Sequence, residues 1–229
     1  MDPVETIGLW AVLWVGTHIG ISSSLRARLI HAAGPDRYRG IYSLVAFATL
    51  GPLIYEFAYH KHSGPLLWYL RDNHAARGLT WLLMFFAFIL LAASLINPVP
   101  SSMGGQASQS APRGLQKVTR HPGLVAFSTF GIAHLLMNGW VGDVIFFGAF
   151  PVLGIAGGIN QDHRKLRELG ESYRSFIEAT SFLPFAALLT GKQKWQSRET
   201  PWLAILVGLV LAAVIVAVHP YIFGGNPLG

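Results

Sequence analysis

Cysteine is absent from this chain of 229 residues, and charged residues are scarce, at 12% of the total. Without cysteine, the chain cannot form a disulfide, a thiolate-ligated metal site, an iron–sulfur cluster or the covalent attachment of a c-type haem. Soluble globular domains carry about a quarter charged residues. Because 52% of the residues here are hydrophobic, we expect an integral membrane protein in contact with the lipid bilayer.

Long apolar runs without charge define the expected fold class, an all-α polytopic membrane helix bundle. A helix that crosses the bilayer core needs about 20 apolar residues. The sequence predicts about six transmembrane helices, at residues 6–25, 40–59, 78–97, 122–139, 143–160 and 202–219. Because the loops between these spans are short, residues 1–229 are expected to form a single membrane domain.

Two further segments are expected to lie outside the bilayer core. Residues 98–115 are rich in Pro, Ser, Gly and Gln, which predicts a flexible cytoplasmic loop. The apolar stretch within residues 173–190 is short and is interrupted by Pro184. This pattern predicts an interfacial or re-entrant segment rather than a further span.

Basic residues are distributed unevenly between the two sets of loops. Of the 17 Lys and Arg residues, only Lys61, Arg71 and Arg77 fall in the loops that the other fourteen avoid. Because cytoplasmic loops carry an excess of basic residues, both termini are expected on the non-cytoplasmic side. The net charge of +6 is thus explained by membrane orientation, and no nucleic-acid partner is expected.

Two histidines lie deep within uncharged apolar runs, His18 in the first expected span and His134 in the fourth. A titratable side chain is costly inside a membrane helix and by default marks a functional site. Imidazole is the commonest side-chain ligand for metals and a frequent ligand for haem iron. A single such histidine can instead form an interhelical hydrogen bond, so a ligand pair and a structural role both remain open.

Helical spacing places aromatic residues on the same face as each histidine. The two stripes are formed by Trp10, Trp14, His18 and Ser22, and by Phe127, Phe130, His134, Met137 and Asn138. Aromatic walls such as Trp14 and Phe130 suit a planar macrocycle, and they suit an ordinary membrane core equally well.

The other histidines are expected to have different roles. His121 precedes His134 by thirteen residues, which corresponds to about 20 Å along a helix. The two cannot face one iron from a straight helix, so His121 is expected in the cytoplasmic surface layer. His60, His62 and His74 fall in an outer loop, where solvated polar residues are expected, and a metal-binding role for them stays open.

An ordered set of short motifs runs along the chain. They are W-V-G-T-H-I-G-I-S-S at 14–23, Y-R-G-I-Y-S at 38–43, T-R-H-P at 119–122, A-H at 133–134, N-G at 138–139, D-x-R at 162–164, G-E at 170–171 and T-S-x-x-P-F at 180–185. Together they resemble the NnrU family of integral membrane proteins, and the resemblance covers nearly the whole chain, to about Leu189.

The resemblance implies a haem b protein of the bacterial inner (cytoplasmic) membrane, related to the plant 15-cis-ζ-carotene isomerases. It maps the iron ligands onto His18 and His134. Two functions follow from it: haem-dependent cis–trans isomerisation of a polyene that enters from the bilayer, or a redox or sensing role in nitrite and nitric oxide metabolism (denitrification). If the chain is an enzyme, the resemblance favours a carotenoid isomerase.

Polar residues at the cytoplasmic ends of the fourth and fifth spans are expected to meet. The connection at residues 138–143 is very short, so the two helices should be antiparallel neighbours. We expect Arg120 and His121 to form a polar cluster with Asp162 and Arg164. An arginine of this cluster would pair with Asp162 or would bind a haem propionate.

A more distant likeness is to the isoprenylcysteine carboxyl methyltransferases, membrane enzymes that bind S-adenosylmethionine. It rests on R-H-P at 120–122 and on an aromatic run that begins at Tyr173 and ends in a proline. The adjacent glutamates typical of that family are replaced here by Asp162 and His163. The likeness implies an alternative function, methyl transfer from S-adenosylmethionine.

Overall fold

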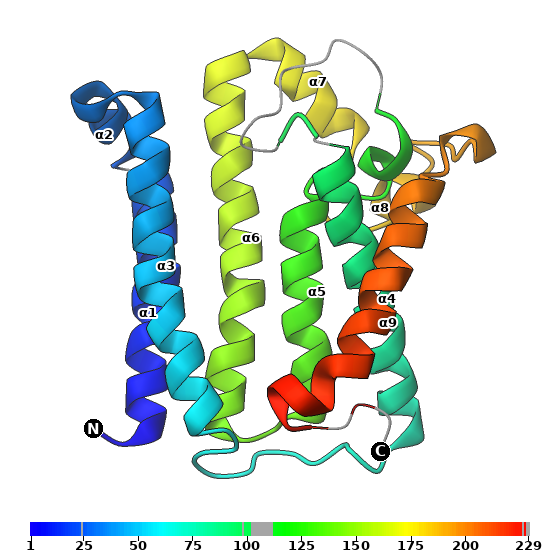
Figure 1. The fold of residues 1–229 in the computed structure, drawn as a ribbon. Coiled ribbons are helices and arrows are strands. Elements are labelled where there is room, and N and C mark those ends of the chain that lie inside the picture. The colour runs from blue at the N-terminus through cyan, green and yellow to red at the C-terminus, as the bar shows by residue number, and fades with distance from the viewer. Residues whose placement is uncertain (24, 98, 102–111, 226, 228–229) are drawn as a thin grey trace. The chain divides into compact units, whose positions relative to one another are not determined.

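The computed structural model describes residues 1–23, 25–97, 99–101, 112–225 and 227. Regular secondary structure in these residues is helical, apart from one isolated antiparallel bridge between Leu66 and Trp140 (Figure 1). The predicted all-α fold class is therefore confirmed.

Five described helices are long and apolar enough to cross a membrane. They are α1 (Pro3–Ser22), α3 (Pro35–Tyr59), α4 (His74–Ile96), α6 (Val141–Leu169) and α9 (Trp202–Phe223). The expected fourth span is α5 (Pro122–Met137), whose 16 residues reach about 24 Å at 1.5 Å per residue. That length falls short of a bilayer core of about 30 Å. The membrane-helix character is confirmed, whereas the count of six spans and the outward termini stay predictions.

Local sequence explains where two of these helices begin and end. Asp2 caps α1, because its carboxylate accepts a hydrogen bond from the backbone N of Val4 at 3.0 Å. The end of α6 is also set locally. This helix continues to Leu169, beyond the expected end at residue 160. It stops at Gly170, whose φ of 58° suits glycine, and α7 (Glu171–Ala179) follows. Asp162 and Arg164 therefore lie on α6 rather than in a loop.

The remaining elements are short. They are α2 (Arg26–Ala33), the 3-10 turns η1 (Gly114–Lys117) and η2 (Ser197–Glu199), and α8 (Ala186–Leu189). The segment expected at residues 173–190 contains most of α7 and all of α8, with Pro184 between them. The predicted loop at residues 98–115 falls mainly on residues 102–111, which lie outside the described residues.

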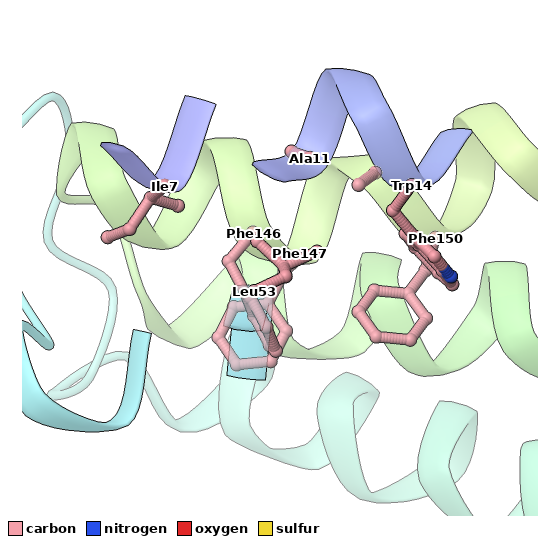
Figure 2. Packing of buried hydrophobic residues seen from close by; sticks show 8 residues of the cluster. Ile7, Ala11, Trp14, Leu53, Phe146, Phe147 and Phe150 are labelled. Atoms are coloured by element: carbon pink, nitrogen blue, oxygen red, sulfur yellow. The ribbon is translucent and has the colours of Figure 1, made fainter. Parts of the chain in front are cut away.

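The helices divide into two compact units, residues 1–81 with 130–160 and residues 82–129 with 161–229. The first unit has an aromatic core that joins α1, α3 and α6, shown in Figure 2. Its buried members are Ile7, Ala11, Trp14, Leu53, Phe146, Phe147, Ala149 and Phe150. Dispersion contacts between such closely packed side chains stabilise helix association in lipid, where the hydrophobic effect is absent.

Glycines let helices approach closely within each unit. In the first unit, a Cβ on Gly131 of α5 would lie 2.5 Å from the carbonyl oxygen of Phe147 on α6. In the second unit, a Cβ on Gly208 of α9 would lie 2.6 Å from the Cα of Ile89 on α4. Small residues at such crossings are typical of membrane helix packing.

The division into two compact units does not test the prediction that residues 1–229 form a single membrane domain.

Candidate cofactor-binding site

His18 lies in α1, next to the aromatic core of the first unit. Its Nδ1 is 2.8 Å from the carbonyl oxygen of Trp14, one helical turn earlier. Because a carbonyl can only accept, Nδ1 carries the hydrogen and the lone pair is on Nε2. The ring also makes edge contacts with Trp14, at 5.5 Å between centroids, and with Tyr42 of α3, at 5.4 Å.

His134 lies near the end of α5 in a closely similar arrangement. Its Nδ1 is 2.9 Å from the carbonyl oxygen of Phe130, again four residues earlier, so its lone pair is also on Nε2. The ring stacks on Phe147, with centroids 4.6 Å apart and planes inclined by 20°. It also contacts Phe130 at 4.2 Å. Aromatic contacts and the hydrogen bond at Nδ1 thus fix the plane of each imidazole.

Aromatic rings connect the two histidines within the first unit. The ring of Trp14 lies 5.1 Å from that of Phe150, and Phe150 lies 5.1 Å from Phe130. Trp14 contacts His18 and Phe130 contacts His134. A line of ring contacts through Trp14, Phe150 and Phe130 therefore runs from His18 to His134. Phe150 is the one member of this line that the sequence did not suggest.

Trp14 also has a buried polar atom that needs a partner. Its side chain is buried, and the indole Nε1 finds no hydrogen-bond acceptor among the described residues. Buried indole N–H groups usually find an acceptor. Trp14 therefore offers one unused donor directly beside His18.

The expected polar cluster is present in the second unit, at the start of α5 and on α6. Arg120 donates from Nε and Nη2 to Oδ2 of Asp162, each at 2.8 Å. His121 donates from Nε2 to Oδ1 at 2.9 Å, and the hydroxyl of Tyr173 donates to the same oxygen at 2.8 Å. The predicted pairing of an arginine with Asp162 is confirmed, and Tyr173 is a member that the sequence analysis missed.

The side chains of this cluster are largely buried. The side chain of His121 is fully buried, so its expected place in a surface layer is wrong: the carboxylate of Asp162 draws the ring inward. Burial raises the pKa of Tyr173, and the hydrogen bond to Asp162 raises it further. The charges of Arg120 and Arg164 act in the opposite direction, which places Arg164 in the electrostatic field of the cluster. A role for these residues in binding a haem propionate stays a prediction.

A second network, in the first unit, was not expected. His62 donates from Nδ1 to Oδ2 of Asp143 at 2.6 Å, and its Nε2 accepts from Nη2 of Arg71 at 3.3 Å. Arg71 also donates to Oδ1 of Asn138 at 2.9 Å. His62 is exposed, as expected, and it also has these hydrogen-bond partners. The only signal for this network in the sequence was the presence of Asp143 in an apolar run.

The described part of the chain contains no group of three or more His, Cys, Asp or Glu side chains placed to hold a metal ion. A haem iron takes its in-plane ligands from the porphyrin, so it needs at most two axial ligands from the protein. The two imidazoles with Nε2 lone pairs match that requirement in kind and in number.

Fold and site together define a polytopic helical membrane protein with two histidines oriented inside apolar helices. The chain belongs to the NnrU family, described as "NnrU protein", which matches residues 7–227. The family resemblance seen in the sequence motifs is thus confirmed.

Two curated relatives carry the name 15-cis-zeta-carotene isomerase, chloroplastic. The chain is 27% identical to the Zea mays protein over 190 residues, which is 81% of this chain and 51% of the relative. It is 27% identical to the Arabidopsis thaliana protein over 200 residues, 84% of this chain and 52% of the relative. The chain therefore spans about half the length of the curated relatives it matches. No solved structure gives a significant match.

These comparisons bear on two earlier expectations. Nothing in them supports the methyltransferase alternative. The membrane character of the chain is supported, whereas the bacterial inner membrane stays a prediction, since both relatives are named as chloroplastic.

Proposed function

We propose that this chain is a membrane-embedded haem b protein that catalyses the cis–trans isomerisation of a polyene, with His18 and His134 as the iron ligands. The observation that carries the proposal is the matched orientation of the two imidazoles. In each, Nδ1 is held by the carbonyl four residues earlier, at 2.8 Å for His18 and 2.9 Å for His134. A hydrogen bond at one ring nitrogen fixes the tautomer and directs the other nitrogen toward a metal.

The side chains that contact the two histidines suit a haem better than a bare metal ion. Trp14 and Phe130, each in contact with one of the histidines, provide flat apolar surfaces for a macrocycle. The unpartnered Nε1 of Trp14 supplies a donor for a polar group of the bound cofactor. The absence of cysteine restricts attachment to non-covalent contacts, which is the mode of haem b.

The substrate class follows from the relatives and from the surroundings of the site. Both curated relatives are named for isomerisation of 15-cis-zeta-carotene, a long apolar polyene. The helices that carry His18 and His134 are apolar, so such a molecule can reach them through the bilayer without crossing water. Isomerisation changes neither the formula nor the net oxidation state of the polyene, so no co-substrate is consumed.

In this proposal, the protein positions the haem and surrounds it with apolar side chains. A bound haem would supply a redox-active iron whose potential depends on its ligands and on burial. His18 and His134 would hold the iron through Nε2. The aromatic side chains Trp14, Phe130, Phe147 and Phe150 exclude water and contact hydrocarbon. No charged general base is needed inside the membrane.

Turnover in a defined membrane tests the proposal. The purified protein in lipid nanodiscs would be incubated with 15-cis-zeta-carotene, with the haem either reduced or oxidised, and the isomers separated by chromatography. We expect conversion in one redox state and its loss in His18→Ala and His134→Ala. A haem-loaded protein that converts no cis-polyene, and whose spectrum responds to nitric oxide, would overturn the isomerase function in favour of the nitric oxide role.

A further inference from the structure

The backbone carbonyl of each candidate ligand is held by a side chain one turn later. Ser22 donates from Oγ to the carbonyl oxygen of His18 at 2.5 Å. Asn138 donates from Nδ2 to the carbonyl oxygen of His134 at 2.8 Å. Each histidine is therefore tethered in both directions along its helix, by its own Nδ1 to residue i−4 and by its carbonyl to the side chain of residue i+4.

Each of these i+4 side chains is in turn held by a residue far away in the sequence. Asn160 of α6 donates from Nδ2 to Oγ of Ser22 at 3.0 Å, across 138 positions. Arg71 donates from Nη2 to Oδ1 of Asn138 at 2.9 Å, across 67 positions. The same two-step link, from a distant donor through a short side chain to the histidine carbonyl, thus occurs twice in the first unit.

Both distant donors are held in specific surroundings. Asn160 follows the apolar run of α6, where an amide must find hydrogen-bond partners to offset its loss of hydration. The guanidinium of Arg71 makes three contacts: Nε donates to the carbonyl of Met137 at 3.1 Å, Nη2 donates to Asn138, and the group lies 5.3 Å from the ring centroid of Trp140. Lys could not reproduce this forked geometry.

We propose that Asn160 and Arg71 are positioning residues for the two iron ligands, acting on His18 through Ser22 and on His134 through Asn138. This inference rests on the proposed haem function. Each link restrains the helical turn that carries a ligand, and the turn sets the direction in which Nε2 points. Loss of a link would free the turn to rotate, so the histidine that it carries would hold the iron less firmly.

The test compares four variants with two matched controls, all in the full-length protein. Asn160→Ala and Ser22→Ala break the first link, and Arg71→Gln and Asn138→Leu break the second. The control Thr49→Val removes a side-chain bond to the carbonyl of Val45 that involves neither histidine. The control Arg39→Gln removes a charge from an exposed ion pair.

The readouts are the low-spin fraction in the absorption spectrum, the electron paramagnetic resonance signal, the reduction potential and haem affinity measured by transfer to apomyoglobin. Removing an outer-shell partner of a metal ligand costs roughly 10–100-fold in affinity. We expect the lower end of that range, about tenfold, for each of the four variants. We also expect a shifted reduction potential and a larger high-spin fraction. Both controls should keep the wild-type spectrum, potential and affinity.

The conservative variants separate positioning from bulk stability. Asn160→Gln keeps an amide donor and should recover part of the wild-type spectrum. Arg71→Lys keeps the charge without the fork and should behave like Arg71→Gln. If Asn160→Ala does not fold, Ser22→Ala breaks the same link with the loss of a single hydroxyl. Wild-type affinity, spectrum and potential in the folded variants would overturn the inference, whereas a wild-type protein without haem would overturn the proposed function itself.

Discussion

The buried carboxylate of Asp143 accepts two hydrogen bonds from His62, a residue 81 positions earlier in the chain. One comes from the backbone N at 3.0 Å and the other from Nδ1 at 2.6 Å. Asp143 is fully buried and lies in the first turn of α6, where the helix dipole favours a negative charge. His62 has a φ of 60°, which is uncommon for a residue other than glycine. The carboxylate therefore fixes a backbone turn as well as a side chain.

The first prediction follows from that pair. Asp143→Asn should lower the free energy of unfolding by roughly 1–3 kcal/mol, because a buried donor loses its charged acceptor. Thermal unfolding of the detergent-solubilised protein at pH 7 measures the change. Asp36→Asn is the matched control, because Asp36 is in an exposed ion pair with Arg39, and such pairs contribute about 0–1 kcal/mol. Equal melting temperatures for the two variants would contradict the structural role of Asp143.

The second prediction concerns the cluster around Asp162. Asp162→Asn should destabilise the protein by about 3 kcal/mol, because it leaves the largely buried Arg120 without its counter-charge. Tyr173→Phe removes one hydrogen bond to the same carboxylate and should cost about 1 kcal/mol. Urea-dependent unfolding monitored by tryptophan fluorescence provides the comparison. A smaller effect for Asp162→Asn than for Tyr173→Phe would contradict this ranking.

The third prediction is a pH dependence at Glu199. The hydrogen bond from Lys117, at 2.7 Å between Nζ and Oε2, holds the pKa of Glu199 below its ordinary value of 4.5. A depressed pKa in the folded state contributes stability above the unfolded-state pKa, and this contribution is lost as the pH falls through the folded-state pKa.

The stability difference between the wild type and Glu199→Gln should therefore be constant near neutral pH and should shrink as the pH falls below about 4.5. Melting temperatures measured from pH 7 to pH 3 give this difference directly. A difference that grows on acidification would show that folding raises the pKa of Glu199 instead of lowering it.

The fourth prediction assigns the ligands. His18→Ala and His134→Ala should each abolish the six-coordinate low-spin spectrum, because each removes one of the two axial imidazoles. His121→Ala should keep that spectrum, since His121 is engaged with Asp162. Spectra of the three variants, taken at equal protein concentration, decide the assignment. Loss of the spectrum in His121→Ala together with its retention in His134→Ala would make the assignment wrong.

The sequence allowed prediction of features that depend on local pattern. Long uncharged runs predicted the apolar helices, and the helical period placed Trp14 beside His18 and Phe130 beside His134. The short connection at residues 138–143 predicted that an arginine of the cluster, Arg120 or Arg164, would pair with Asp162, since neighbouring antiparallel helices must bring those ends together. Each of these predictions needed only the helical repeat, the cost of charge in lipid and the length of a turn.

Features that depend on tertiary contacts could not be predicted in this way. The links from Asn160 to Ser22 and from His62 to Asp143 join residues 138 and 81 positions apart, and no local pattern identifies such partners. The burial of His121 was missed for a related reason. The cluster with Asp162 was expected, but the position of His121 at the head of a helix does not show how fully other side chains cover it. The extension of α6 to Leu169 was missed because the polar residues after 160 suggested a loop.

The absorption spectrum of the wild-type protein, purified from membranes of haem-replete cells, tests the central claim most directly. The two oriented imidazoles predict a coloured protein with the low-spin bands of bis-histidine protohaem, and acid acetone should extract the pigment because no cysteine is present to bind it covalently. A colourless protein that also fails to take up added haem would contradict the claim that His18 and His134 hold an iron.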